Sequence, residues 1–224
     1  MFRGGLPDDF DHLLVAVDRL DASMAWFAER LGVRPVEGGK HASWGTHNAL
    51  LSLGPKRYLE TIALDADADP AARASGEAVF CFSAGALPRV MGWCAGSRNL
   101  AERASRAAQA GVDIGQPIQG GRDCPDGTRI AWTITPPRFL GDGLIPFFID
   151  WGETAHPSAA APTGCRLARL EGEHPDPERI WRMLASVGSR LSVSRGPRAR
   201  LIATIEGPAG SITLSDAPSV ARRS

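Results

Sequence analysis

Cysteine is scarce in this sequence and follows no ligand pattern. The four cysteines are Cys81, Cys94, Cys124 and Cys165, and they lie far apart at irregular intervals. Because no C-x-x-C pair occurs, zinc ribbons and redox dithiols do not organise this fold. At 224 residues the chain can bury a core without crosslinks. We therefore expect reduced thiols and a cytoplasmic protein.

Net charge and long apolar runs are also missing. The chain carries 25 basic and 25 acidic side chains, so no global field attracts nucleic acid or an anionic membrane. No run approaches the roughly 20 apolar residues that a membrane helix requires. Neither a nucleophile elbow nor an H-E-x-x-H or Walker motif occurs. These absences favour a small-molecule ligand or substrate, with no nucleic acid and no membrane as partner.

The apolar pattern predicts an order of strand, helix and three strands. The first unit comprises a strand at 11–18, a helix at 19–32 and strands at 33–38, 48–54 and 58–64. In the helix, Leu20, Met24, Phe27 and Leu31 recur at helical spacing, and Gly32 suits the left-handed residue that ends it.

The same order returns twice. The second unit has a strand at 78–83, a helix at 97–111 and strands at 112–118, 128–135 and 145–151. The third has a strand at 165–172, a helix at 176–188 and strands at 189–195, 198–207 and 211–216. We predict an N-terminal segment at 1–10, paired modules at 11–151, a third module at 165–215 and a flexible tail at 216–224.

Side-chain alternation predicts one apolar and one mixed face on the strands of the first unit. Leu13 and Val15 share a face, while His12 lies on the opposite one with Leu14. In the strand at 58–64, Glu60 shares a face with Tyr58 and Ile62. An isolated buried carboxylate is too costly, so Glu60 needs a hydrogen bond, an ion pair or a metal. If the first and fourth strands pair, His12 is its neighbour.

Three segments carry a resemblance to a known family. They are DHLLVAV, the block GGKH…WGTHNALLSLG…YLE, and IPFFIDW. Together they resemble the glyoxalase-like domain family of the vicinal oxygen chelate superfamily over roughly residues 10–188, most clearly over 11–65. The resemblance implies an α+β fold of repeated βαβββ modules, whose curved mixed sheets surround a cavity and carry helices outside. We expect the first two modules to form one cup, and the third to pack beside it or to pair across a homodimer.

The resemblance also implies a divalent metal, such as Fe, Mn, Ni, Zn or Mg, that binds vicinal oxygens of a substrate. The positions that match the first module's metal ligands are His12 and Glu60. In the second module the strand at 78–83 offers only Cys81. Asp150 is either a third ligand or the acid of the turn before Trp151. His41 is an alternative ligand, a substrate contact or a loop histidine that binds the backbone.

Other polar and aromatic residues complete the predicted site. Tyr58, the only tyrosine, is a candidate proton donor beside Glu60, or part of an amphipathic core rim. Asn48 either contacts substrate or closes a turn. Trp44, Trp132 and Phe148 wall a pocket or belong to the ordinary core.

The leading functional hypothesis is a metal-dependent lyase, isomerase or dioxygenase that acts on a small substrate with vicinal oxygens. Glu60 or Tyr58 would handle a proton. The first alternative is a non-catalytic protein that binds or sequesters a small molecule in the same cavity. The second is a structural or partner-binding protein with a vestigial site, in which Glu60→Gln would stabilise the fold.

Overall fold

The computed structural model describes residues 5–82 and 88–215, and the order of strand, helix and three strands occurs in it three times. The first unit consists of β1 (Phe10–Ala16), α1 (Leu20–Leu31), β2 (Val36–His41), β3 (Thr46–Gly54) and β4 (Arg57–Leu64). The helix α2 (Pro70–Phe80) follows it. The second unit consists of β5 (Arg89–Gly96), α3 (Leu100–Gln109), β6 (Ile118–Asp123), β7 (Arg129–Ile134) and β8 (Phe147–Asp150).

A short 3-10 helix, η1 (Pro157–Ala159), connects the second unit to the third. The third unit consists of β9 (Arg166–His174), α4 (Pro177–Ser186), β10 (Ser192–Arg195), β11 (Arg200–Gly207) and β12 (Gly210–Ser215). The predicted α+β fold of repeated βαβββ modules is therefore confirmed. The predicted tail at 216–224 lies outside the described residues.

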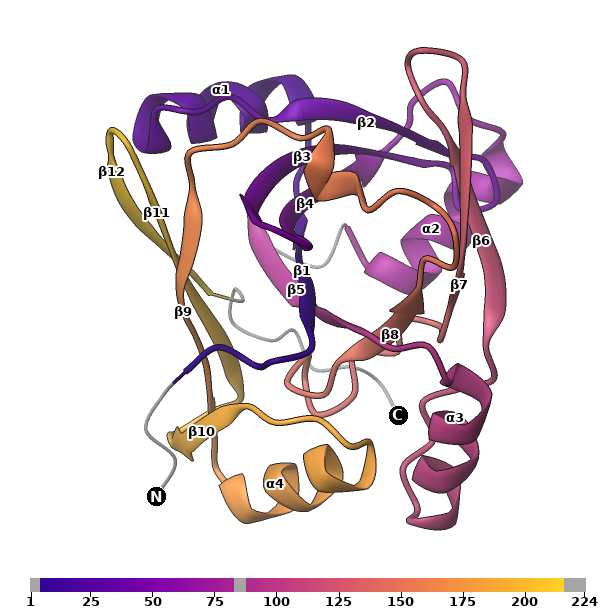
Figure 1. The fold of residues 1–224 in the computed structure, drawn as a ribbon, viewed down its shortest axis with the longest axis vertical. Coiled ribbons are helices and arrows are strands. Elements are labelled where there is room, and N and C mark those ends of the chain that lie inside the picture. The colour runs from indigo at the N-terminus through magenta and orange to yellow at the C-terminus, as the bar shows by residue number, and fades with distance from the viewer. Residues whose placement is uncertain (1–4, 83–87, 216–224) are drawn as a thin grey trace.

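The first two units close one barrel, in the order β1-β4-β3-β2-β6-β7-β8-β5 (Figure 1). β1 pairs with β4 in parallel and with β5 in antiparallel orientation. The other seam, between β2 and β6, has a single partner pair, Lys40 with Asp123. Glycines accompany this seam: a Cβ on Gly39, whose φ is 143°, would lie 2.2 Å from the carbonyl oxygen of Asp123. The two modules thus share one continuous interior.

The two faces of the first unit's strands separate an outer core from the barrel interior. Leu13 and Val15 point outward into a core that they share with Phe27 of α1. Leu14 and Ile62 point inward, into a cluster with side chains of the second unit. This matches the predicted alternation.

The third unit forms its own four-stranded sheet, in the order β10-β9-β11-β12. Its apolar face, which includes Leu170, Leu201 and Ile205, joins the outer core of the barrel. In Figure 1 this sheet lies along one side of the barrel, next to α1 and above α4. A lone sheet has one apolar face to bury, and the outer wall of the barrel provides the surface.

The strand predicted at 78–83 is wrong. Residues up to Phe80 belong to α2, and the first strand of the second unit is β5. Asp69 caps this helix, because its Oδ1 accepts hydrogen bonds from the backbone nitrogens of Ala71 and Ala72. Pro70 at the first helical position reinforces the start. The strand predicted at 112–118 is also displaced, since β6 begins at residue 118.

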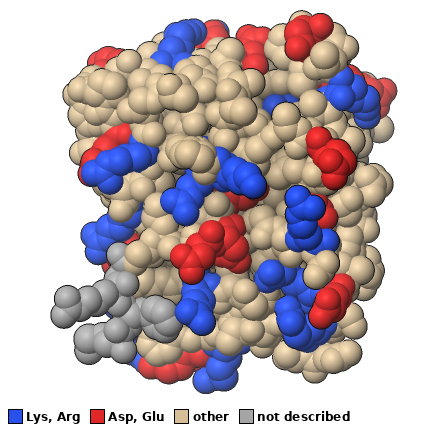
Figure 2. Space-filling model, in the orientation of Figure 1, with Lys and Arg blue, Asp and Glu red and all other residues tan. Residues whose placement is uncertain are grey.

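The surface agrees with the balanced charge of the sequence. Figure 2 shows acidic and basic side chains interspersed on one face of the molecule, with no broad patch of either sign. In the part of the chain that the structure describes, no helix is long and apolar enough to cross a membrane.

Candidate active site

A cavity lies inside the barrel. Its volume is about 40 Å³, counted as space for the centres of water molecules, which is room for roughly three waters. Polar side chains line one part of it: His12, His41, Asn48, Tyr58, Glu60 and Arg122. Aromatic side chains line much of the rest: Trp44, Phe80, Trp132, Phe147 and Trp151. The cavity therefore suits a small ligand with one polar and one apolar end.

Glu60 reaches this cavity from the middle of β4. Asn48 Nδ2 donates a hydrogen bond of 2.7 Å to Glu60 Oε1. The two residues are diagonal neighbours across β3 and β4, where Leu50 stands opposite Glu60. Asn48 Oδ1 in turn accepts a hydrogen bond of 3.2 Å from Arg122 Nη1. The guanidinium group thus fixes the orientation of the amide, and the amide presents its N–H group to the carboxylate.

A glycine on β2 makes the contact between Asn48 and Arg122 possible. β2 lies between β3 and β6 in the barrel. A Cβ atom on Gly38 would lie 2.4 Å from Asn48 Oδ1 and 2.6 Å from Arg122 Nη1. These distances are far below the optimal separation of non-bonded atoms, so any side chain at position 38 would separate the amide from the guanidinium.

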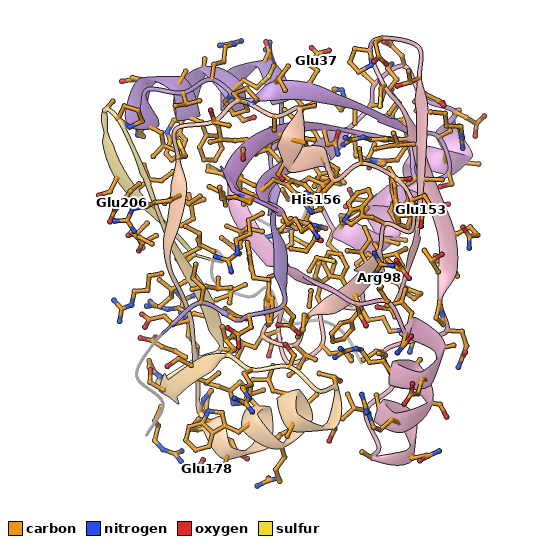
Figure 3. The ribbon with its side chains drawn as sticks, viewed as in Figure 1. Glu37, Arg98, Glu153, His156, Glu178 and Glu206 are labelled. Atoms are coloured by element: carbon orange, nitrogen blue, oxygen red, sulfur yellow. The ribbon has the colours of Figure 1, made fainter. Side chains whose placement is uncertain are left out.

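Asp11 orients the imidazole ring of His12 by binding its Nδ1 atom. Its Oδ1 is 2.8 Å from His12 Nδ1, and its Oδ2 is 3.2 Å from His156 Nε2 and 3.1 Å from Trp151 Nε1. Burial alone would raise the pKa of Asp11, but the hydrogen bonds from His12 and His156 outweigh it and lower the pKa to about 2. Asp11 is therefore an ionised acceptor that ties β1 to the segment before η1. Figure 3 shows His156 near the centre of the view, over the barrel.

The ring of His12 faces Glu60. When Nδ1–H donates to Asp11, Nε2 of a neutral imidazole carries a lone pair. This atom lies 3.6 Å from Glu60 Oε2. Two lone-pair atoms then face each other, and a proton or a cation between them would satisfy both. His12 and Glu60 are therefore the candidate reactive pair of the cavity.

His41 and Tyr58 flank this pair as neutral groups. His41 Nδ1 lies 3.0 Å from Thr46 Oγ1, and its Nε2 lies 4.0 Å from Glu60 Oε1. Burial lowers the pKa of His41 to about 4, although the charge of Glu60 acts in the opposite direction. The ring of Tyr58 stacks on His12 at 4.6 Å between centroids. Burial, followed by the charges of Glu60 and Asp11, raises the pKa of Tyr58 well above its usual value, so its hydroxyl stays protonated.

The structure brings most of the predicted site residues to one cavity. The residues that line it are His12, His41, Trp44, Asn48, Tyr58, Glu60 and Trp132. Phe148 and Asp150 are not among the lining residues. Phe148 points into the outer core, where the guanidinium of Arg103 lies 4.4 Å from its ring centroid. Its neighbour Phe147 lines the cavity instead, because successive side chains of a strand face opposite sides.

Asp150 is the last residue of β8 and precedes the turn that follows this strand. Its Oδ1 accepts a hydrogen bond of 2.9 Å from the backbone nitrogen of Gly152. The structure therefore gives Asp150 the role of a turn acid, which is the second of the two roles that the sequence allows.

The donor set fits a divalent metal only in part. His12 and Glu60 provide one nitrogen and one carboxylate, and the predicted third ligand, Asp150, is not in the cavity. Within residues 5–82 and 88–215, no group of three or more His, Cys, Asp or Glu side chains is arranged to hold a metal ion. Arg122 brings a positive charge to the same space. A complete protein-held shell, as in a structural or three-ligand catalytic site, is therefore not formed by these residues.

The predicted site included neither Asp11 nor Arg122 nor His156. The similar segments VEGGKH at 36–41 and IQGGRD at 118–123 correspond to β2 and β6, but they align Arg122 with Lys40. Because Lys40 is exposed and pairs with Asp65, this similarity gave no signal for a buried Arg122. Asp11 adjoins His12 in the sequence, but a strand normally sends adjacent side chains to opposite faces. His156 is remote in sequence from both, so no local pattern links it to the cavity.

Comparisons with known proteins agree with this fold. Residues 10–188 match a family described as the glyoxalase-like domain. No curated protein sequence matches the chain. The structure of a hypothetical protein from Staphylococcus aureus is similar with a TM-score of 0.62 and 15% identity, over 93% of this chain and 86% of that chain.

Two solved enzymes are more distant. Methylmalonyl-CoA epimerase from Mycobacterium tuberculosis has a TM-score of 0.40 and 18% identity, over 71% of this chain and 97% of that chain. A mutant of 4-hydroxymandelate synthase from Streptomyces coelicolor has a TM-score of 0.47 and 15% identity, over 95% of this chain and 65% of that chain. At these values the two enzymes carry no argument about activity, and the Staphylococcus aureus structure supports the fold alone.

Proposed function

Because this chain belongs to the glyoxalase-like domain family, we propose that its barrel cavity is the active site of a small-molecule enzyme. The reaction is that of a lyase or isomerase, in which Glu60 removes a proton from a carbon next to an oxygen-bearing carbon of the substrate. The observation that carries this proposal is the state of Glu60: Asn48 holds one carboxylate oxygen, and the other faces His12 at 3.6 Å inside an apolar-walled cavity.

The surrounding groups support proton transfer at this position. A general base must be held within reach of the substrate and shielded from bulk water. Glu60 is 8% exposed, and aromatic side chains close much of the cavity. Tyr58 keeps its proton because burial raises its pKa, so it can donate a hydrogen bond to a substrate oxygen on which charge develops. His12, fixed by Asp11, can take up or return a proton through Nε2.

Deuterium exchange tests this proposal without knowledge of the full reaction. Wild-type protein is incubated in D₂O with hydroxyacetone, pyruvate or lactaldehyde, and loss of the C–H signal is followed by NMR. We expect exchange with at least one compound, and a fall of about 10²–10⁴-fold in Glu60→Gln. Glu37→Gln is the matched control, because Glu37 is an exposed carboxylate on β2 that points away from the cavity (Figure 3).

Equal exchange in wild type and Glu60→Gln would overturn the role of Glu60. Ligand binding without exchange in the wild type, with affinity that survives His12→Ala, would instead favour the non-catalytic binding protein.

A metal-dependent lyase, isomerase or dioxygenase is the second candidate. One observation favours it: a carboxylate that orients a histidine towards the ligand site is the usual support of a metal-binding imidazole, and Asp11 does this for His12. His12 and Glu60 would hold the ion, which when bound would polarise substrate oxygens. Elemental analysis of protein purified without a metal column separates the candidates. If near-stoichiometric metal is found in the wild type and is lost in both His12→Ala and Glu60→Ala, the metal-dependent enzyme is favoured over an enzyme in which Glu60 acts as the base without a metal.

A further inference from the structure

Arg122 is a buried cation with one donor, Nε, that lacks a hydrogen-bond partner in the described part of the chain. The residue is 6% exposed and lines the cavity. Its Nη1 donates to Asn48, but its Nε is buried and has no hydrogen-bond acceptor among residues 5–82 and 88–215. Trp132, on the adjacent strand, has a buried Nε1 in the same state. Native proteins rarely leave such donors unsatisfied.

The free side of the guanidinium has the geometry of a carboxylate site. With Nη1 bonded to Asn48, the remaining edge consists of Nε–H and Nη2–H, which point in the same direction. This edge binds a carboxylate through two parallel hydrogen bonds. In the described part of the chain, Arg122 forms no ion pair with an acidic side chain. It is connected to Glu60 only by hydrogen bonds through Asn48, which accepts from Arg122 and donates to Glu60. The missing anion is therefore one that a ligand can bring.

We propose that the substrate is a short-chain carboxylic acid whose carboxylate binds side-on to Nε and Nη2 of Arg122. Its neighbouring oxygen-bearing carbon then lies towards Glu60. This inference rests on the proposed function and adds the substrate class. Room for roughly three waters matches an acid of a few carbons, and Trp132 and Phe147 offer an apolar wall for its remaining end.

A carboxylate fits better than a phosphate. Arg122 is the only lysine or arginine that lines the cavity among the described residues. Glu60 already contributes one negative charge to the same small space. A dianion such as phosphate would add two negative charges beside Glu60, and Arg122 could neutralise only one of them. A monoanion such as a carboxylate would be neutralised by Arg122 alone.

Binding of pyruvate tests the proposal, with pyruvamide as its neutral counterpart and inorganic phosphate as the competing anion. Three tryptophans line the cavity, so intrinsic fluorescence reports occupancy. We expect millimolar pyruvate to bind and both other compounds to bind at least tenfold more weakly. Arg122→Gln should lower pyruvate affinity about tenfold or more. Arg129→Gln, which removes an exposed charge from the neighbouring strand β7, should change it less than twofold.

A purely structural Arg122 predicts different results. Arg122→Lys keeps the positive charge but loses the side-on edge, so a counter-charge role would leave pyruvate affinity unchanged, whereas the proposal requires it to fall. This variant also keeps the test open if Arg122→Gln fails to fold. Equal binding of pyruvate and pyruvamide, tighter binding of phosphate, or no binding of pyruvate by the wild type would overturn the inference.

Failure of this inference is distinguishable from failure of the proposed function. Glu60→Gln should retain pyruvate binding while deuterium exchange falls. Loss of exchange in Glu60→Gln together with unchanged affinity in both Arg122 variants would leave Glu60 as the base and remove only the carboxylate site.

Discussion

Gly38→Ala places one methyl group at the contact that organises the candidate site. The added Cβ would lie 2.4 Å from Asn48 Oδ1, 2.6 Å from Arg122 Nη1 and 3.0 Å from Leu50 Cγ. The φ angle of Gly38 is not in the left-handed region, so alanine is compatible with the backbone. All three neighbours are side-chain atoms that can move, and the first two must separate. The substitution therefore acts on one hydrogen bond rather than on the strand.

The cost follows from that hydrogen bond. A hydrogen bond to a charged group contributes about 1.5–3 kcal/mol, and replacing glycine by alanine at a compatible position returns about 0.4–1 kcal/mol through the unfolded state. We expect the free energy of unfolding to fall by about 1–2 kcal/mol. Deuterium exchange should fall as well, because Asn48, no longer oriented by Arg122, would hold Glu60 less firmly.

Urea denaturation of a double-mutant cycle measures the effect. In an Asn48→Ala background the methyl group no longer separates a bonded pair, so the additional cost of Gly38→Ala should shrink to a few tenths of a kcal/mol. Gly5→Ala is the control, because a Cβ on Gly5 would have no neighbour within 4 Å. The reasoning is refuted if Gly38→Ala leaves stability and exchange unchanged, or if its cost is the same in both backgrounds.

Two further predictions concern His41 and Phe148. Burial lowers the pKa of His41 from 6.5 to about 4, so its neutral form contributes stability above pH 6.5 that is lost as the pH falls through 4. Relative to His41→Asn, the wild type should lose about 3 kcal/mol of unfolding free energy over that range, and parallel stability–pH curves would contradict this. Phe148→Leu should lower the free energy of unfolding by about 1–2 kcal/mol without a change in pyruvate affinity. A change in affinity with unaltered stability would instead place this ring at the ligand.

The proximity of His12 and Glu60 could be predicted because both residues lie on strands whose faces are encoded locally. Period-two alternation assigns His12 and Glu60 to the mixed face, and the pairing of β1 with β4 then brings them within 3.6 Å. The same alternation places Phe147 and Phe148 on opposite faces of β8. It could not show which of them faces the cavity, because this run is apolar and no polar residue marks the inner face. The capping signal of α2, Asp69 followed by Pro70, was present in the sequence. The segment at 78–83 is rich in residues that favour strands, and it was therefore predicted as a strand.

The sequence by itself determined the repeated order of strands and helices, the apolar faces and the presence of a lone carboxylate among them, because periodicity, caps and turns depend on neighbours along the chain. Only the tertiary structure decided that Arg122 meets Asn48 across Gly38 and that Asp11 joins His12 to His156. These contacts require the barrel to close and a later segment to pack over it. Their partners come from strands and loops far apart in sequence, and no local pattern specifies which distant donor will face which acceptor.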